Sequence, residues 1–180
     1  MAHQARRPLL LLDLQPHLVG RLVELRPLRA DDYDALYVVA SDPLIWEQHP
    51  DERWREDVFR GFFEQHLETG SALVILDRSD GRVIGTSRYH GYDPERGEGE
   101  VEIGWTFLAR SHWGGAVNGE VKQLMLEHAF GSVERVIFFV APDNLRSRRA
   151  VEKIGATFVG LERRTPEAPE RAFYELRRPA

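Results

Sequence analysis

The sequence predicts a mixed α/β fold in which helices pack on one central sheet. Segments whose apolar residues alternate with polar ones, as in half-buried strands, are interspersed with segments whose apolar residues recur at helical spacing. Residues 136–140 (VIFFV) form a continuous apolar run between two helical segments, which is typical of a central strand covered on both faces. The early strands are closely joined and are expected to be antiparallel, whereas this later strand is expected to belong to a β-α-β crossover.

We expect the order β-α-α-β-β-β-α-β-α-β-β, with a strongly twisted mixed sheet of six to seven strands and about four helices. The expected strands lie at residues 21–28, 72–77, 82–89, 100–107, 136–140, 157–162 and 171–176. Later helices are expected at residues 54–67, 118–130 and 144–154. The first helix is expected to start at Asp31 or Asp32 and to bury Ala35, Leu36, Val38 and Val39. Asp80-Gly81 predicts a hairpin turn, and residues 93–99 suit another hairpin.

Length and composition fit one globular domain at residues 21–180, preceded by an arm at residues 1–20. With 42% hydrophobic and 29% charged residues, the chain is unlike a disordered one. The net charge of −5 disfavours a nonspecific nucleic-acid binder, and the lack of cysteine excludes disulfides, cysteine-ligated zinc and a cysteine nucleophile. The apolar run at residues 9–12 is too short to cross a membrane. We therefore expect a cytoplasmic protein without nucleic-acid or membrane partners.

Residues 111–120 (SHWGGAVNGE) lie between an expected strand and an expected helix. Glycines at 114, 115 and 119 allow positive φ and close approach of a ligand, and the N–H groups at the start of the helix would face an anion. A plain strand-to-helix turn explains the same residues. Neither the Walker pattern nor GxGxxG is present, which disfavours the nucleotide sites that those patterns build.

Residues 141–156 (APDNLRSRRAVEKIGA) follow the continuous apolar strand. Asp143 or Asn144 can cap the helix, and Ser147 stands three residues after Asn144. Three arginines and Lys153 make the helix basic. A capped, solvated helix explains those charges but not the pairing of this helix with the glycine-containing loop.

Together the two stretches resemble the GCN5-related N-acetyltransferases (GNAT), and within them the branch that includes bacterial ribosomal-protein N-terminal acetyltransferases. That branch has a strand ending E-I-G-x and then W-G-K-G-Y-A-T-E-A; residues 102–105 (EIGW) and 113–121 (WGGAVNGEV) are similar to these patterns. An early L-R-P-L-x-x-x-D is similar to residues 25–28 with Asp32. The resemblance spans roughly residues 21–178.

A later pattern of that family, N-x-x-S-x-x-x-x-x-x-x-G, is similar to Asn144, Ser147 and Gly155. The chain also departs from the family. Trp113 stands where a basic residue or glutamine is usual, and Ala116 and Asn118 stand at two usually small positions of the pyrophosphate loop. Val151 stands where many relatives have a tyrosine general acid, so a tyrosine acid at that position is excluded.

The resemblance implies a GNAT-like fold and transfer of an acetyl group from acetyl-CoA to a primary amine, a protein N-terminus or a small molecule, by direct attack in a ternary complex. It implies cosubstrate contacts at Phe107, Leu108, Trp113, Gly114, Gly115, Ala116, Val117, Asn118, Gly119, Asn144 and Ser147. The loop amides would bind the pyrophosphate, and a backbone N–H near Phe107–Leu108 would stabilise the oxyanion. Ser147, near the thiol, is a candidate catalytic residue. No metal is implied, and the histidines lack HxH or HExxH spacing.

Glu102 is the first candidate for the base that deprotonates the amine. Strict alternation places Ile103, Trp105 and Phe107 on one strand face and Glu100, Glu102, Gly104 and Thr106 on the other. Burial in a central strand would raise the pKa of Glu102 toward a useful range, whereas a simple ion pair with an arginine is the other interpretation. His90 is a rival base because its ordinary pKa suits that role.

Other features leave alternatives open. One aromatic set either lines an acceptor pocket or belongs to the core: Trp46, Trp54, Phe59, Phe62, Phe63 and Trp105. Arg55, Arg60 and Arg88 are expected on a solvated surface. A noncatalytic acyl-CoA-binding or regulatory module on the same fold is the second function class. The acidic chain favours a cationic acceptor, and a homodimer is compatible with the sequence.

Overall fold

A computed structural model describes residues 11–96 and 99–179, which form helices on both faces of one eight-stranded sheet. The strands are β1 (Leu18–Val19), β2 (Val23–Pro27), β3 (Ala72–Asp77), β4 (Val83–Asp93), β5 (Glu100–Leu108), β6 (Arg135–Val140), β7 (Thr157–Glu162) and β8 (Arg171–Arg177). The α-helices are α1 (Tyr33–Ala40), α2 (Glu56–Glu68), α3 (Val117–Ala129) and α4 (Leu145–Lys153). The predicted mixed α/β class is confirmed, and the element order is as predicted except that the sheet has one strand more than the expected six to seven.

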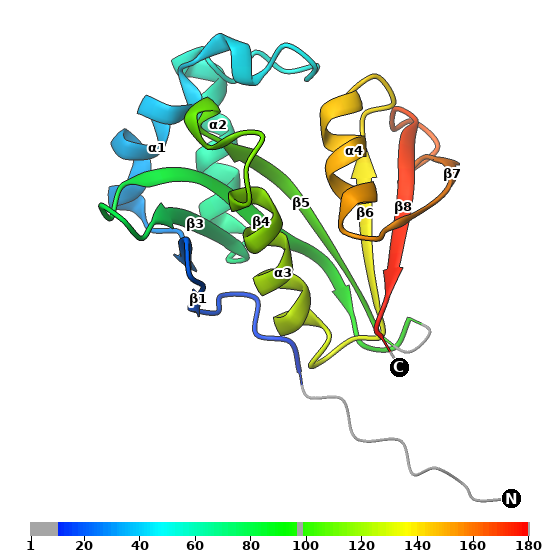
Figure 1. The fold of residues 1–180 in the computed structure, drawn as a ribbon. Coiled ribbons are helices and arrows are strands. Elements are labelled where there is room, and N and C mark those ends of the chain that lie inside the picture. The colour runs from blue at the N-terminus through cyan, green and yellow to red at the C-terminus, as the bar shows by residue number, and fades with distance from the viewer. Residues whose placement is uncertain (1–10, 97–98, 180) are drawn as a thin grey trace, which may run out of the picture.

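The sheet order is β1-β2-β3-β4-β5-β6-β8-β7, and every described pairing is antiparallel except that of β5 with β6. The eighth strand comes from the predicted arm, where Leu18 and Val19 pair with Leu25 and Glu24. Residues 1–10 of the predicted arm, and residues 97–98 of the predicted 93–99 hairpin, lie outside the described residues. The β5–β6 connection through α3 is the predicted crossover (Figure 1).

The first helix differs from its predicted form in two ways. Leu36 and Ala40 are buried, but Val38 is 74% exposed, because the helix buries a narrower stripe than the apolar residues suggest. Asp32 precedes α1 as expected, yet its carboxylate does not cap that helix. It accepts hydrogen bonds from the Arg26 guanidinium at 2.7 and 2.9 Å and from the Arg29 N–H at 2.9 Å. These bonds tie the start of α1 to β2.

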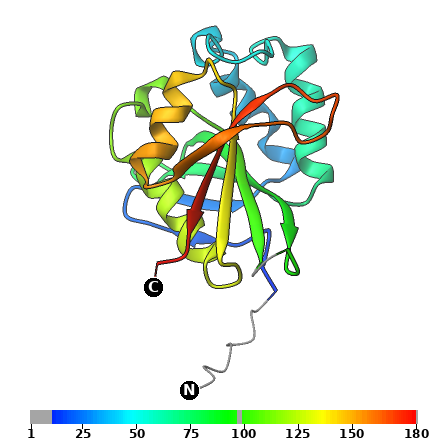
Figure 2. The same ribbon diagram turned by 90° about the vertical axis from the view of Figure 1, so that its right-hand side faces the viewer.

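Two apolar cores lie on opposite faces of the sheet. Figure 2 shows α3 and α4 on one side of the sheet and α1 and α2 on the other. The larger core joins α3 and α4 to the sheet through residues such as Val121, Met125 and Val151. The smaller core joins α1 and α2 to the other face, with Leu36, Phe59 and four further aromatic residues of the described chain. Most of the predicted aromatic set is therefore core: Trp46, Phe59, Phe62 and Phe63.

A bulge in β5 changes which face each side chain occupies. Thr86 pairs with Phe107 and Arg88 with Gly104, so β5 holds one residue more than β4 between these pairs. Trp105 absorbs the extra residue with a φ of 53°, a left-handed conformation that is costly for a residue with a Cβ. The prediction that Ile103 shares a face with Trp105 and Phe107 is therefore wrong. Ile103 packs in the α3 core, whereas Trp105 and Phe107 pack on the α2 side.

The parallel pairing of β5 with β6 is short. It covers Glu100 with Arg135, Val101 with Val136 and Glu102 with Ile137. Beyond Glu102 the two strands diverge, as Figure 1 shows. The second half of β5 therefore turns an edge without a β6 partner toward the region between the two halves of the sheet.

Candidate active site

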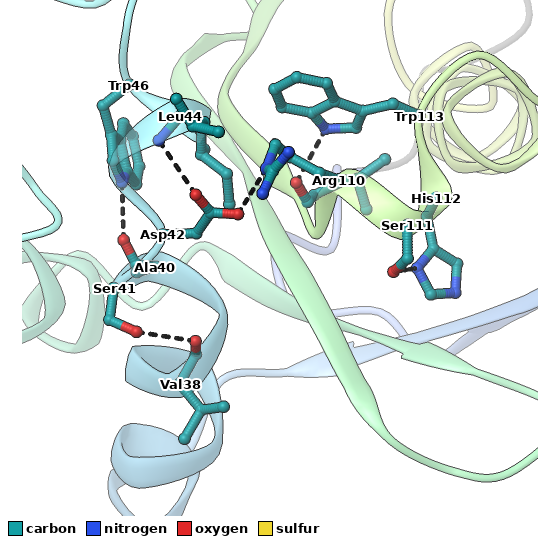
Figure 3. Close-up of polar contacts among 12 residues, drawn as sticks. Val38, Ala40, Ser41, Asp42, Leu44, Trp46, Arg110, Ser111, His112 and Trp113 are labelled. Carbon is teal, nitrogen blue, oxygen red and sulfur yellow. Dashed lines mark hydrogen bonds and ion pairs between the residues drawn. The ribbon is translucent and has the colours of Figure 1, made fainter.

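The loop that follows β5 is anchored to the segment that follows α1. Arg110 forms an ion pair with Asp42 at 2.5 Å between Nε and Oδ2, and Asp42 also accepts from the Leu44 N–H at 3.0 Å (Figure 3). The Trp113 indole N–H donates to the Leu108 carbonyl at 2.9 Å. These contacts hold the predicted pyrophosphate loop beside the end of β5.

The N–H groups at the start of α3 are unpaired within the described chain. None from residue 114 to residue 119 donates to a described backbone or side-chain acceptor; the first that does is that of Glu120, to the Ala116 carbonyl at 2.9 Å. Ala116 has a φ of −80°, so the alanine in place of glycine causes no strain. Gly114 has a φ of +72°, and a Cβ on Gly115 would meet nothing within 4 Å. The loop therefore offers free donors and space to an anion.

Glu120 in the first turn of α3 faces away from that loop. Its carboxylate accepts hydrogen bonds from the N–H groups of Arg21, Leu22 and Val23, at 3.0, 2.6 and 2.9 Å. Burial would raise the pKa of this carboxyl, but the three N–H donors hold its pKa below the usual range. Glu120 thus fixes the start of α3 against the β1–β2 turn, and the three N–H donors stabilise its negative charge. No pattern in the sequence pointed to this role.

Arg146 places a cation beside Trp113, which stands where the family pattern has a basic residue or glutamine. Its guanidinium carbon lies 4.0 Å from the centre of the Trp113 ring, and its Nη2 donates to the Ile45 carbonyl at 2.7 Å. The Arg146 N–H also donates to Gln48 at 3.1 Å. The first turn of α4 is thereby joined to the loop and to the segment between α1 and α2. Only its basic neighbourhood in the sequence pointed to this residue.

Asn144 caps α4, as one of the two predicted candidates. Its side-chain oxygen accepts from the Ser147 N–H at 3.0 Å, and Asn144 itself is buried. The Ser147 hydroxyl makes no hydrogen bond to another described residue and is half-buried. Val151, where relatives have tyrosine, is part of the α3–α4 core.

Glu102 lies at the last residue pair of the β5–β6 ladder and is only 4% exposed. Its carboxylate forms a close ion pair with Arg164, from the β7–β8 connection. Burial raises the pKa of Glu102 to about 7, although Arg164 and Arg88 oppose the rise. A Cβ on Gly104 would lie 3.2 Å from Oε1 of Glu102, so glycine there leaves room for the carboxylate.

His90 pairs across the β4–β5 ladder with Glu102. Its side chain is exposed, and its ring centre lies 5.0 Å from that of Trp105 in an edge-to-face arrangement. Burial of part of the ring, with the positive charges of Arg88 and Arg164, lowers the pKa of His90. The two candidate bases are therefore neighbours on one sheet face.

The prediction for Arg88 is wrong. Arg55 and Arg60 are about half exposed, as expected, but Arg88 is only 3% exposed. Its guanidinium carbon lies 3.7 Å from the centre of the Trp105 ring. The β4 position next to Tyr89, which packs into the α3 core, sends the Arg88 side chain to the opposite face.

Lys122 of α3 is buried on the other side of β5, and no pattern in the sequence pointed to it. Its Nζ donates to Oγ1 of Thr106 at 2.6 Å, and Thr106 lies 2.7 Å from the Ser87 hydroxyl. Burial lowers the pKa of Lys122 to about 7. No carboxylate forms an ion pair with this lysine among the described residues.

Residues 11–96 and 99–179 contain neither a cluster of metal ligands nor a helix that could span a membrane. No group of three or more histidine, aspartate or glutamate side chains is arranged to hold a metal ion. No helix in this part of the chain is both long and apolar enough to span a membrane.

Comparison with known proteins identifies a family. The family model described as an acetyltransferase (GNAT) domain matches residues 22–157. The uncharacterized N-acetyltransferase YnaD of Bacillus subtilis (strain 168) is 25% identical over 142 residues, which cover 77% of this chain and 81% of YnaD.

Solved structures share the fold. A GCN5-related N-acetyltransferase from Brucella melitensis superposes with a TM-score of 0.81 at 21% identity, covering 97% of this chain and 83% of that one. Mycobacterium smegmatis RimJ in complex with CoA-disulfide superposes with a TM-score of 0.67 at 21% identity, covering 91% and 88% of the two chains. Since the family model covers most of the chain, this protein belongs to the GNAT family of acetyl-CoA-dependent acyltransferases.

Proposed function

We propose that the protein transfers an acetyl group from acetyl-CoA to a primary amine by direct attack in a ternary complex. One observation supports this most strongly. A buried carboxylate with a pKa of about 7, Glu102, stands where β5 and β6 begin to diverge, beside an edge that leads to a loop of unpaired N–H groups. The arrangement offers a base and an anion site to the two reactants of such a transfer.

The pyrophosphate of the cosubstrate fits the loop by its chemistry. The N–H groups of Gly114–Gly119 have no described acceptor, and they stand at the positive end of the α3 dipole. Trp113 with Arg146 adds a cation beside them. The pantetheine arm would follow the free edge of β5 at Phe107 and Leu108 and pass Asn144 and Ser147 on α4. Acetyl-CoA, when bound there, supplies the activated acetyl group.

Glu102 would remove the proton from the attacking amine, directly or through a water molecule. An alkyl ammonium is protonated at neutral pH, so attack requires a base whose pKa lies near the working pH. The pKa of about 7 for Glu102 meets that condition. His90 is the less suitable base, because burial and two nearby arginines lower its pKa.

The remaining roles belong to the backbone and to α4. A backbone N–H on the unpaired edge near Phe107 or Leu108 would polarise the acetyl carbonyl. The Ser147 hydroxyl, which makes no hydrogen bond to another described residue, would donate to the departing sulfur or relay a proton from water. In this proposal the acceptor is a protein N-terminus or a small molecule, and the reaction takes place in the cytoplasm without metal, nucleic acid or membrane. A homodimer stays a prediction.

Binding at the loop is tested with two glycine variants of matched chemistry. Gly115→Val places a branched side chain at the unpaired N–H groups, and Gly61→Val makes the same change on α2, where a Cβ also meets nothing within 4 Å. We expect Gly115→Val to weaken CoA binding at least about tenfold in titration calorimetry, because one lost charge-assisted hydrogen bond has that effect. Gly61→Val should bind CoA like the wild type.

Catalysis is tested by screening an amine library with CoA release from acetyl-CoA as the readout. Release that depends on the amine supports the proposal. Unchanged CoA affinity in folded Gly115→Val would contradict the proposed position of the pyrophosphate.

A further inference from the structure

Arg88 is a buried cation whose hydrogen-bonding groups are left without partners. It is 3% exposed, and its Nε and Nη1 have no acceptor among the described residues. Almost all buried donors in proteins are hydrogen-bonded, because an unpaired buried donor costs free energy. An arginine cannot avoid that cost by losing its proton. Burial lowers the pKa of Arg88 only to about 10, so the guanidinium is charged at neutral pH. The charge of Glu102 acts on Arg88, but among the described residues no anion accepts a hydrogen bond from its Nε or Nη1.

A second guanidinium converges on the same point. Arg88 lies 3.7 Å and Arg164 4.9 Å from the centre of the Trp105 ring, and Arg164 also lies 4.7 Å from that of Phe139. The left-handed φ of Trp105 brings its indole to this face. One strained aromatic residue thus holds two cations beside Glu102.

The groups that surround this cluster leave it with excess positive charge. Glu102, with a pKa of about 7, is already paired with Arg164, and Asp51 is paired with Arg53. The nearby imidazole of His66 is neutral, because burial and the charges of Arg88 and Arg53 lower its pKa to about 3. The local charge is therefore opposite to the net charge of −5 of the whole chain.

Arg88 and Glu102 are also close enough to hold one small molecule. His90 pairs with Glu102, and Arg88 lies two residues before His90 on the same face of β4. Diagonal neighbours of this kind have backbones roughly 7–8 Å apart. Side chains as long as these reach toward each other across such a separation, so an amine at Glu102 and a carboxylate at Arg88 can belong to one small molecule.

We infer that the acceptor is an amino acid, whose amine lies at Glu102 and whose carboxylate binds the unpaired guanidinium N–H groups of Arg88 with help from Arg164. This inference rests on the proposed acetyl transfer and names its substrate class. The net charge of the chain favoured a cationic acceptor. The inferred acceptor instead carries a carboxylate close to its amine. The reaction forms an amide bond from the amine nitrogen to the acetyl carbon and breaks the thioester, and the amine proton leaves through Glu102.

The experiment compares acids with amines. Wild-type protein is screened with the twenty standard L-amino acids, and the best substrate is compared with its decarboxylated amine. We expect kcat/KM for the acid to exceed that for the amine by at least about tenfold, in line with a hydrogen-bonded ion pair. Equal kcat/KM values for acid and amine would overturn the inference and leave acetyl transfer standing.

Variants then assign the preference to Arg88. Arg88→Gln should lower kcat/KM for the acid by about 10- to 100-fold through KM, and lower it more than kcat/KM for the amine, so that the preference for the acid is lost. Arg88→Lys should keep part of the preference. Arg82→Gln, at a side chain that is 83% exposed just before β4, is the matched control and should change neither value. A preference for the acid that survives in folded Arg88→Gln would overturn the inference.

A binding measurement separates this inference from the proposed function. Amino acids are titrated into the CoA-saturated wild type and into CoA-saturated Arg88→Lys. The lysine variant keeps the positive charge, so it can be measured even if Arg88→Gln does not fold. If an amino acid binds but no CoA is released from acetyl-CoA in its presence, the carboxylate site is supported and acetyl transfer is contradicted. If none of the twenty amino acids binds, the carboxylate site is wrong, whatever the amine library shows.

Discussion

The two faces of β5 bury charge in opposite ways. On the α2 face, Glu102 is accompanied by Arg164 in an ion pair and by Arg88 nearby. On the α3 face, Lys122 is buried with the hydroxyl of Thr106 as its hydrogen-bond acceptor. Both residues have a pKa of about 7, one raised and one lowered from its ordinary value. Burial disfavours the charged form in both cases, so Glu102 is a weaker acid and Lys122 a weaker base than in water.

The difference lies in what each face can do with its group. Glu102 shares its face with the unpaired donors of Arg88 and lies where β5 leaves β6. Lys122 lies between α3 and the sheet, where the nearest groups are core residues and two hydroxyls. We therefore expect substitution of Glu102 to change catalysis and substitution of Lys122 to change the free energy of unfolding.

The largest expected effect is that of Glu102→Gln. Glutamine keeps the shape but cannot accept the amine proton, so turnover should fall by about 10²–10⁴-fold while CoA affinity is unchanged. In the wild type, kcat/KM should rise with pH and level off above about 7, as Glu102 becomes ionised. In the variant the rise should shift to alkaline pH, because only amine already deprotonated in solution reacts.

Glu100→Gln is the matched control for that change. Glu100 is also buried on β5, two residues earlier, and pairs with Arg135. We expect Glu100→Gln to lower the melting temperature clearly and to change turnover only slightly. Full activity of Glu102→Gln at neutral pH would make Glu102 structural, and His90 or binding of the neutral amine would then be the better explanation.

Lys122→Met should change the pH dependence of stability. The pKa of Lys122 is about 7 in the folded chain, against 10.5 when it is free in solution. Between these values the unfolded chain binds the extra proton, so the free energy of unfolding should fall as pH falls, by up to about 1.4 kcal/mol per pH unit. Methionine, of similar volume, removes that slope and should stabilise the protein at pH 7.

Urea unfolding at pH 7, 8 and 9 measures the effect of Lys122→Met. Lys153→Met is the control, since Lys153 is the other lysine of the sequence and is exposed at the end of α4. A wild-type slope equal to that of Lys122→Met would show that Lys122 keeps its proton in the folded chain. A loss of CoA-dependent turnover in folded Lys122→Met would contradict the purely structural role of the α3 face.

Ser147→Ala should have the smallest effect. Its hydroxyl lies on the α3–α4 side and makes no hydrogen bond to another described residue. If it donates to the sulfur, turnover should fall by about 2- to 10-fold, the value of one neutral hydrogen bond, and CoA affinity should fall less. Assays of CoA release and of CoA binding measure the two changes. Equal turnover in the variant would limit Ser147 to packing and capping.

Much of the fold is predictable because its signals are local. The strand at residues 72–77 and the Asp80-Gly81 turn were predicted where the structure has them, and the cap of α4 is one of the two predicted candidates, Asn144. Each depends on side-chain alternation, positive φ or a hydrogen bond across three residues, and these need only neighbours in the sequence. The continuous apolar run of β6 likewise predicted a covered central strand.

The sequence by itself determined the order of the elements, the glycine-containing loop and the position of Glu102 on a central strand. Tertiary structure alone decided the environment of that carboxylate. Arg164, its partner, is 62 residues away, and the bulge at Trp105 arises from unequal pairing between β4 and β5 rather than from any local pattern. Packing likewise decided that Arg88 and Lys122 are buried. The exposure of a charged side chain depends on which helices cover its face of the sheet, and the local sequence does not specify that.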